Sequence, residues 1–493
     1  MNLIAKIKTI SSQTVLLWFV LSLAFLLTGY KALELGKFGD GEVYNSLARN
    51  MADGFGSFWQ PYFSESVFNV FYEHPPFIIF LKSLLFTFFG DSIYFEGVYA
   101  LFIGSILLLL MARLWHLTNI SYIGVWWVLL LIVAIPYFTY ALDTGLLVVT
   151  FSAFFLSSVI LSYKSQFKTN YYLFSIYAAI FIYLGFISKG PVALATLALP
   201  TIAFITLKTK FITAIKTTLI MIITFILLLS ATLYFSEDAQ IFWQNFWSSQ
   251  VLTSLSGTRG ITNYWQLPEH FINEIISPII IIGFISLFQW KLKLSKSPYF
   301  WFFLLLAIAS SFPFFLSPRQ NNHYIFHSWF LFILALAHLT TPIAKNSQKI
   351  LKQKPKLKII YFFLTIFLII TTFYLMIDRK DKLGRRADFF ADFYLQNIQI
   401  KPRSMVTYCP YDRLTKGSSD VKIFPSLQRV YKASYTKKTN APYLIIEKNK
   451  GCVIPDNYFL VHTNPTRRYL LYKRKYNANL NYTPKQLKNA RKI

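Results

Sequence analysis

The chain has 493 residues, of which 55% are hydrophobic and 14% are charged, whereas soluble globular proteins carry about 25% charged residues. The formal net charge is +28, but the lysines and arginines lie mainly in short connectors between apolar runs and in the last quarter of the chain. This pattern excludes an ordinary soluble protein and favours membrane topology over nucleic-acid binding, so the partners that we expect are membrane lipids and no nucleic acid.

Apolar runs long enough to cross a bilayer recur along the first three quarters of the chain. A span needs roughly 18 or more apolar residues. The first run follows Lys6 and Lys8, and no small-residue cleavage site comes after it, so we interpret it as a retained span rather than a signal peptide. We expect about eleven spans, near residues 13–30, 94–115, 121–142, 144–163, 171–187, 190–207, 213–235, 271–290, 297–316, 323–343 and 358–377.

Basic residues concentrate in alternate connectors, and this sets the expected orientation. With a cytoplasmic N-terminus, every strongly basic short connector lies inside, as the positive-inside rule favours. The loops 31–93, 236–270 and 317–322 then lie on the outer face, together with Asp143. We therefore expect a multi-pass protein of the cytoplasmic (inner) membrane whose N-terminus is cytoplasmic.

The apolar stretch 76–89 tests this topology. It is short and contains Lys82, which suits a helix lying along the membrane surface better than a span. If it crossed the membrane, every later connector would change sides and the basic connectors would lie outside. We therefore place this helix on the surface, within the first outer loop.

The composition changes after residue 377. Residues 378–493 are polar, basic and without a span, and they predict a short helix at 386–398 and strands at MVTY, QRVYKA, APYLIIEK, NYFLVHT and RRYLLYK. The expected fold is thus mainly α: a transmembrane helical bundle over 1–377, with surface helices in its first outer loop, and a small extracytoplasmic α/β domain over 378–493. The only cysteines, Cys409 and Cys452, both lie in this domain. They could form a disulfide outside the cell or remain two small hydrophobic side chains.

The first outer loop carries acids where the chain leaves the membrane. Asp40 and Glu42 precede Val43, Leu47 and Met51, whose spacing predicts a short helix on the membrane surface. Acids at this position could simply cap the helix.

Further acids lie on the same face of the membrane. Glu73 and His74 stand directly before a Pro-Pro pair that opens the surface helix, and Asp143 ends the span at 121–142. Because Asp40, Glu73 and Asp143 come from three separate connections, we expect a pocket lined with carboxylates at the bilayer surface.

Such a pocket suits transfer of a sugar from a lipid phosphate. A carboxylate can accept the proton of an attacking hydroxyl, and the departing phosphate needs cations to hold its charge. The candidate cations on this face are Lys189, Arg259 and Arg319, with His74 and His323 as further groups. Lys189 could instead be a lysine that snorkels at the end of a helical hairpin.

Four motifs together resemble the GT-C fold glycosyltransferases, in particular the group of bacterial aminoarabinose transferases of lipid A and protein O-mannosyltransferases. They are GDGEVYNSLARNMADG, FYEHPPF, SKGPVALATLALP and RQNNHYIFHSWF, and the resemblance covers roughly residues 10–345. This sequence departs from the group in two places: Gly41 splits the usual Asp-Glu pair, and His74 stands where a lysine is common.

The resemblance implies roles for individual residues. Asp40 and Asp143 would be catalytic, and Glu73 and His74 would be the candidate ligands if a divalent metal ion is used. The residues implied to bind substrate are Glu42, Tyr44, Glu73, His74, Lys189, Arg259, Arg319 and Tyr324. The implied reaction is inverting transfer of a sugar from a polyprenyl-phosphate donor to a hydroxyl or phosphate of a lipid A-like lipid, a protein or a glycan.

Three other functions remain open at this point. A transporter or flippase of lipid-linked substrates would place ionisable residues near the middle of its spans. Most spans of this chain lack acids, and the exceptions, such as Glu274, lie near span ends. A polymerase or ligase of surface polysaccharide would carry its acids in later loops. A purely structural membrane protein does not account for surface helices that carry acids.

Overall fold

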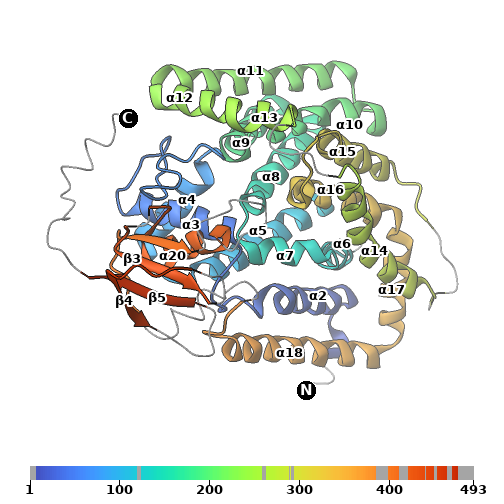
Figure 1. The fold of residues 1–493 in the computed structure, drawn as a ribbon. Coiled ribbons are helices and arrows are strands. Elements are labelled where there is room, and N and C mark those ends of the chain that lie inside the picture. The colour runs from blue at the N-terminus through green and yellow to red at the C-terminus, as the bar shows by residue number, and fades with distance from the viewer. Residues whose placement is uncertain are drawn as a thin grey trace. The chain divides into compact units, whose positions relative to one another are not determined.

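The computed structural model of the chain describes residues 7–118, 124–257, 263–287, 289, 294–384, 398–409, 420–438, 440–448, 452–462 and 469–475 (Figure 1). The chain divides into two compact units. The first contains Met1–Phe63 and Val70–Arg386, and the second contains Ser64–Asn69 and Ala387–Ile493. The first unit is helical and the second is built on a sheet.

The first unit is a bundle of apolar helices, which confirms the expected multi-pass membrane architecture. Within the described residues, eight helices are long and apolar enough to cross a membrane: α2 (Ser12–Gly29), α5 (Phe95–Thr118), α8 (Leu147–Phe167), α9 (Tyr171–Lys189), α11 (Phe211–Phe235), α14 (Gln266–Leu287), α15 (Pro298–Phe315) and α18 (Pro355–Asp378).

Two bent helix pairs add to this number. α6 (Trp126–Val133) and α7 (Pro136–Thr144) meet at 71°, and the segment formed by η3 (Asn322–Ile325) and α16 (Phe326–Leu339) meets α17 (Thr341–Gln353) at 65°. Counting each pair as one span gives up to ten in the described part of the chain. The predicted span at 190–207 is a shorter apolar segment, made of η1 (Pro191–Ala198) and α10 (Leu199–Leu207). The total of about eleven therefore stays a prediction.

The two long connections between spans carry shorter helices. α3 (Gly39–Ala52) and α4 (Phe77–Phe89) lie in the first connection and pack on each other. The second connection holds α12 (Glu237–Phe246), η2 (Trp247–Leu252) and α13 (Thr253–Leu255). α4 has only 13 residues, which is too short for a bilayer of about 30 Å at 1.5 Å per residue. The surface helices expected in the first loop are present.

The first and last spans run side by side (Figure 1), and this fixes the start of the first connection. Phe19 packs edge-on against Tyr361 at 5.1 Å between ring centroids. Beyond the helix ends, Leu35 accepts a backbone hydrogen bond from Gly384 at 2.8 Å and donates one to Lys382 at 2.9 Å. The segment that leads from α2 into α3 is thus held by the chain that leaves α18.

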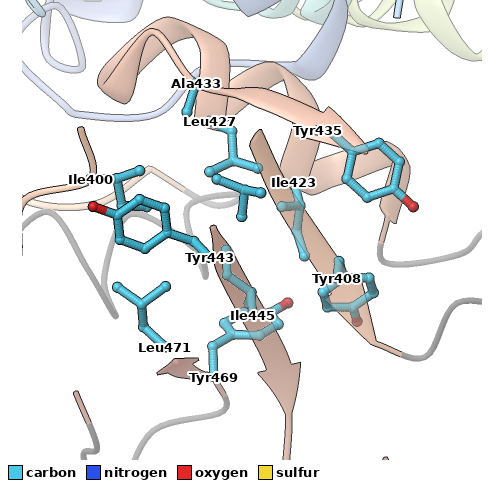
Figure 2. Close-up of a cluster of buried hydrophobic side chains, with 11 residues drawn as sticks. Ile400, Tyr408, Ile423, Leu427, Ala433, Tyr435, Tyr443, Ile445, Tyr469 and Leu471 are labelled. Atoms are coloured by element: carbon cyan, nitrogen blue, oxygen red, sulfur yellow. The ribbon is translucent and has the colours of Figure 1, made fainter. Parts of the chain in front are cut away.

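The second unit is a five-stranded mixed sheet with the strand order β2-β1-β3-β5-β4. Its strands are β1 (Met405–Cys409), β2 (Ser434–Thr436), β3 (Tyr443–Glu447), β4 (Tyr458–His462) and β5 (Tyr469–Arg474). β1 pairs in parallel with β2 and β3, whereas β5 runs antiparallel to β3 and β4. The helix α20 (Asp420–Tyr431) contributes Ile423 and Leu427 to a buried cluster with Tyr408 and Ile445 (Figure 2). The predicted α/β character is confirmed.

Three local predictions concern the second unit. The strand expected at QRVYKA is wrong, because this stretch is the end of α20 followed by two residues that lead into β2. Ile423 and Leu427 lie one helical turn apart and are both buried, and this longer pattern outweighs the local β-forming residues. The helix expected at 386–398 falls almost entirely outside the described residues. Cys409 and Cys452, whose pairing the sequence left open, form a disulfide.

Candidate active site

The start of α3 is fixed by contacts from the preceding segment. Phe38 is extended and its side chain makes no capping hydrogen bond. Instead, the backbone N–H of Lys37 donates to Glu42 Oε1 at 3.2 Å, and the Glu42 side chain is 3% exposed. A carboxylate in the first turn also interacts favourably with the helix dipole. Glu42 therefore ties the preceding segment to the first turn of α3, and its contact with substrate stays a prediction.

One face of α3 carries Asp40 and Tyr44, which lie one helical turn apart. Asp40 is exposed, whereas Tyr44 is 5% exposed. Burial raises the pKa of the Tyr44 phenol well above its usual range, and the charges of Asp40, Glu73 and Tyr324 add to the effect. The Tyr44 phenol is therefore neutral, and two of the three predicted acids, Asp40 and Glu73, lie near it.

The chain before α4 brings further groups to the same phenol. The Tyr44 ring lies 5.7 Å from the His74 ring and 6.3 Å from the Phe71 ring, measured between centroids. Asn50 of α3 holds this part of the loop by donating to the carbonyl oxygen of Phe63 at 2.8 Å. The structure thus places Asp40, Glu73 and His74 around Tyr44.

Predicted cations approach these acids from two later connections. Lys189 ends α9, and Gly190 turns the chain with φ +82°. Asp40 acts electrostatically on Lys189, and Lys189 and Arg319 both act on His323. These groups are therefore neighbours, and they join the residues around Tyr44 into one mixed cluster of acids and bases.

Tyr324 belongs to the same cluster, because its charged form would interact with Tyr44. Its hydroxyl accepts a hydrogen bond from Asn321 Nδ2 at 3.2 Å, and its ring packs edge-on against His323 at 4.7 Å. Arg259, the remaining predicted cation, lies outside the described residues.

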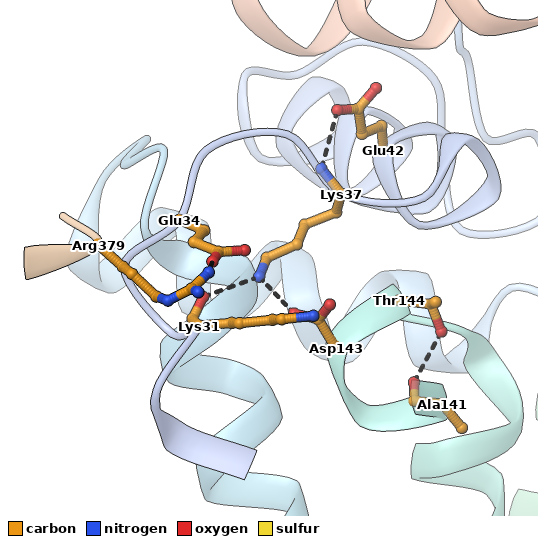
Figure 3. A network of polar contacts seen from close by, with 8 residues as sticks. All are labelled: Lys31, Glu34, Lys37, Glu42, Ala141, Asp143, Thr144 and Arg379. Atoms are coloured by element: carbon orange, nitrogen blue, oxygen red, sulfur yellow. Dashed lines mark hydrogen bonds and ion pairs between the residues drawn. The ribbon is translucent and has the colours of Figure 1, made fainter. Parts of the chain in front are cut away.

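Asp143 lies at the C-terminal end of α7, beside the cluster. Its Oδ1 pairs with Lys37 Nζ at 2.8 Å, and Lys37 Nζ also donates to the carbonyl oxygen of Lys31 at 3.2 Å (Figure 3). Asp143 is not among the charges that act on Tyr44. However, the carbonyl group of the next residue, Thr144, lies so close to the backbone of Gly41 that a side chain at Gly41 would overlap it. Gly41 directly follows Asp40 in α3. The backbones that carry Asp40 and Asp143 are therefore in direct contact.

The cluster can perform two chemical tasks. An exposed carboxylate at Asp40 can accept a proton, while Lys189 and Arg319 can hold a phosphate. A divalent metal fits less well, because the described residues contain no group of three or more His, Cys, Asp or Glu side chains able to hold one. Glu73 and His74 would supply two ligands, and the described part of the chain brings no third to them.

The sequence did not single out Lys37 or Asn45, and it used Lys82 only to argue against a span. Lys37 pairs with Asp143, and Lys82 Nζ donates to Asn45 Oδ1 at 2.9 Å. An ionisable residue within an apolar helix is itself a signal of function, so Lys82 could have been found. Lys37 carried no comparable signal.

The fold matches solved membrane proteins. No protein-family model matches the chain, and no curated protein sequence is significantly similar to it. ArnT from Cupriavidus metallidurans aligns with a TM-score of 0.55 and 12% identity in its structure bound to undecaprenyl phosphate, over 93% of this chain and 97% of that one. Its apo structure aligns with a TM-score of 0.57 and 11% identity, over 92% and 97%. The oligosaccharyltransferase AglB from Archaeoglobus fulgidus aligns with a TM-score of 0.44 and 12% identity, over 88% of this chain and 69% of that one.

The likeness to ArnT runs through almost the whole of both chains, at an identity too low to carry residue roles across. The chain therefore has the fold of ArnT, as the resemblance in the sequence implied.

Proposed function

We propose that the protein is an inverting glycosyltransferase that moves a sugar from a polyprenyl-phosphate donor to an acceptor at the outer face of the cytoplasmic membrane. The observation that carries this proposal is the convergence around Tyr44 of two acids, Asp40 and Glu73. The charge of Asp40 also acts on Lys189, and Lys189 and Arg319 both act on His323. Such a cluster matches a substrate that combines a phosphate with sugar hydroxyls.

The proposed step is a single displacement at the anomeric carbon. An acceptor hydroxyl gives its proton to the Asp40 carboxylate as its oxygen bonds to the anomeric carbon. The bond from that carbon to the phosphate oxygen breaks, and the electron pair leaves with the lipid phosphate. Lys189 and Arg319 hold the charge that the phosphate gains. Attack from the side opposite the leaving group inverts the anomeric configuration.

The acceptor classes are the ones that the sequence left open: a lipid A-like lipid, a protein or a glycan. If the acceptor is a phosphate, it already carries the attacking oxygen as an anion and needs no base. Asp40 would then orient the acceptor rather than deprotonate it. The fold likeness to ArnT, which has been solved with undecaprenyl phosphate, supports a lipid-phosphate donor for this chain.

We also propose that the site and the sheet-containing domain face the outside and that the N-terminus is cytoplasmic. The disulfide between Cys409 and Cys452 supports this orientation, because disulfides persist in oxidising compartments. The basic connectors counted from the sequence point the same way. We assign residues 1–377 to the transmembrane module and 378–493 to the soluble domain.

A transporter or flippase has less support. Glu274, an acid inside a span that such a protein could use, is 8% exposed and already accepts a hydrogen bond from the backbone of Tyr137 at 2.6 Å. His270 Nδ1 also lies 3.7 Å from Glu274 Oε1. These contacts suit a structural link between α14 and α7.

The test is transfer by the purified protein from a labelled polyprenyl-phosphate sugar. With a hydroxyl acceptor, we expect Asp40→Asn to lose at least about 10²-fold in rate, within the range for loss of a general base. Asp53→Asn is the matched control, because Asp53 follows the opposite end of the same helix and is exposed. Wild-type rates in Asp40→Asn would remove Asp40 from the reaction.

A further inference from the structure

Lys82 is a buried lysine inside an otherwise apolar helix. It lies in the middle of α4 and is 1% exposed. Its ammonium donates to Asn45 Oδ1 at 2.9 Å and to the carbonyl oxygen of Gly145 at 3.5 Å, and it sits 4.9 Å from the centroid of the Tyr99 ring. The charge of Glu96 also acts on it.

These contacts join the three segments that carry the predicted acids. Asn45 belongs to α3, which carries Asp40 in its first turn. Gly145 directly follows α7, the helix that carries Asp143 in its last turn. Lys82 itself lies in α4, which follows Glu73 in the chain. One ammonium group therefore lies where all three acid-bearing segments meet.

We propose that Lys82 is a positioning residue, whose ammonium sets the spacing between the acid-bearing segments by holding α3 and the turn after α7 against α4. This proposal rests on the transferase function proposed above. Lys82 contacts neither sugar nor phosphate in this account, and it acts through the residues that do.

The choice of lysine at this position argues for such a role. Burying a charge costs free energy, and an apolar side chain of similar volume is often neutral or stabilising in its place. An apolar side chain would leave the two oxygens of Asn45 and Gly145 without this donor. Burial lowers the pKa of the Lys82 ammonium to about 8, against the opposing effect of Glu96, so the group still carries its charge at neutral pH.

The test compares variants on both sides of the contact with Asn45. We expect Lys82→Met and Asn45→Leu each to lower kcat by about 10²-fold, the effect of misplacing a reacting group by roughly 1 Å. The KM for the donor should stay within about twofold, because the phosphate contacts do not pass through Lys82. Asn45→Asp should keep most of kcat, since it retains an acceptor for the ammonium and removes an amide nitrogen that has no partner among the described residues.

Lys358 supplies a matched control. It is also a buried lysine, 6% exposed, and it donates to the carbonyl oxygens of Lys8 and Ile10 at 3.2 and 2.8 Å. We expect Lys358→Met to leave kcat within about threefold of the wild type, a change of less than 1 kcal/mol in the barrier. Equal losses of kcat in Lys358→Met and Lys82→Met would overturn the proposal, because they would reflect a general effect of removing a buried lysine.

A second readout needs no activity. Amide hydrogen exchange in α3 and at residues 143–145 should quicken in both Lys82→Met and Asn45→Leu and stay slow in Asn45→Asp. Unchanged exchange in these segments, or full kcat in Asn45→Leu, would overturn the positioning role. A wild-type protein without transferase activity would instead overturn the proposed function, and the exchange experiment would still decide the role of Lys82.

Discussion

Gly41→Ala changes one hydrogen into a methyl group at the point where α3 meets the turn after α7. A Cβ at this position would lie 3.2 Å from the carbonyl carbon of Thr144 and 3.4 Å from the Cα of Gly145, and it would overlap the carbonyl oxygen of Thr144. Backbone atoms cannot rotate away as a flexible side chain can. The two backbones would therefore have to separate.

The size of that separation gives the expected effect. Relief of the overlap needs a movement of roughly 1 Å, and a misplacement of about 1 Å in a catalytic geometry costs about 10²-fold in rate. This corresponds to about 2.7 kcal/mol in the barrier. Because Gly41 lies next to Asp40, we expect the loss in kcat rather than in the KM for the donor.

The assay is transfer by the purified variant, with thermal unfolding in detergent measured alongside. Gly283→Ala is the matched control, because a Cβ at Gly283 meets nothing within 4 Å and that glycine also lies within a helix. Alanine favours helix over glycine, so the control should be at least as stable and as active as the wild type. A Gly41→Ala protein with wild-type kcat would refute the close approach of the two backbones.

Three further predictions concern charge and covalent links. Lys37→Met should lower kcat, and it should lower the free energy of unfolding by about 1–3 kcal/mol, because it leaves the half-buried Asp143 without the ammonium that pairs with it. Chemical denaturation measures the change in stability, and an unchanged midpoint would count against the ion pair. Lys189→Gln should lower kcat/KM for the donor by about 10- to 100-fold, which is the value of a charge-assisted hydrogen bond to phosphate. Steady-state kinetics over a range of donor concentrations measures this effect, and unchanged kinetics would exclude Lys189 from the phosphate site. The 43-residue separation closed by Cys409 and Cys452 predicts that loss of the disulfide costs the second unit about 4 kcal/mol. A maleimide that cannot cross the membrane should label these thiols in intact cells only after reduction. Labelling without reduction would contradict the bond, and no labelling of reduced intact cells would contradict the outer location.

Hydropathy and charge were enough to predict the multi-pass bundle, because a span is a local property of about 20 residues. The same holds for the short helix 77–89, whose length and Lys82 kept it out of the span count. Asp40 and Glu73 could be expected on the same face of the membrane, because both lie in the first outer loop.

Contacts between distant parts of the chain could not be predicted in the same way. Lys37 pairs with Asp143, and Lys82 bonds to Gly145. Each lysine is far in the sequence from the residue that it contacts, so only the folded chain shows that these lysines lie at the site. Glu42 illustrates the reverse case: it shares a segment with Asp40, yet it turns back to the Lys37 amide.

The most direct test of the central claim is the chemical fate of a lipid-linked sugar in liposomes that contain the purified protein. A cell-envelope extract supplies the acceptors, and mass spectrometry follows the donor lipid. We predict that the donor is converted to polyprenyl phosphate while one sugar mass appears on an acceptor. A donor lipid that crosses the bilayer with its sugar still attached, and no lipid phosphate formed, would contradict the account and indicate transport.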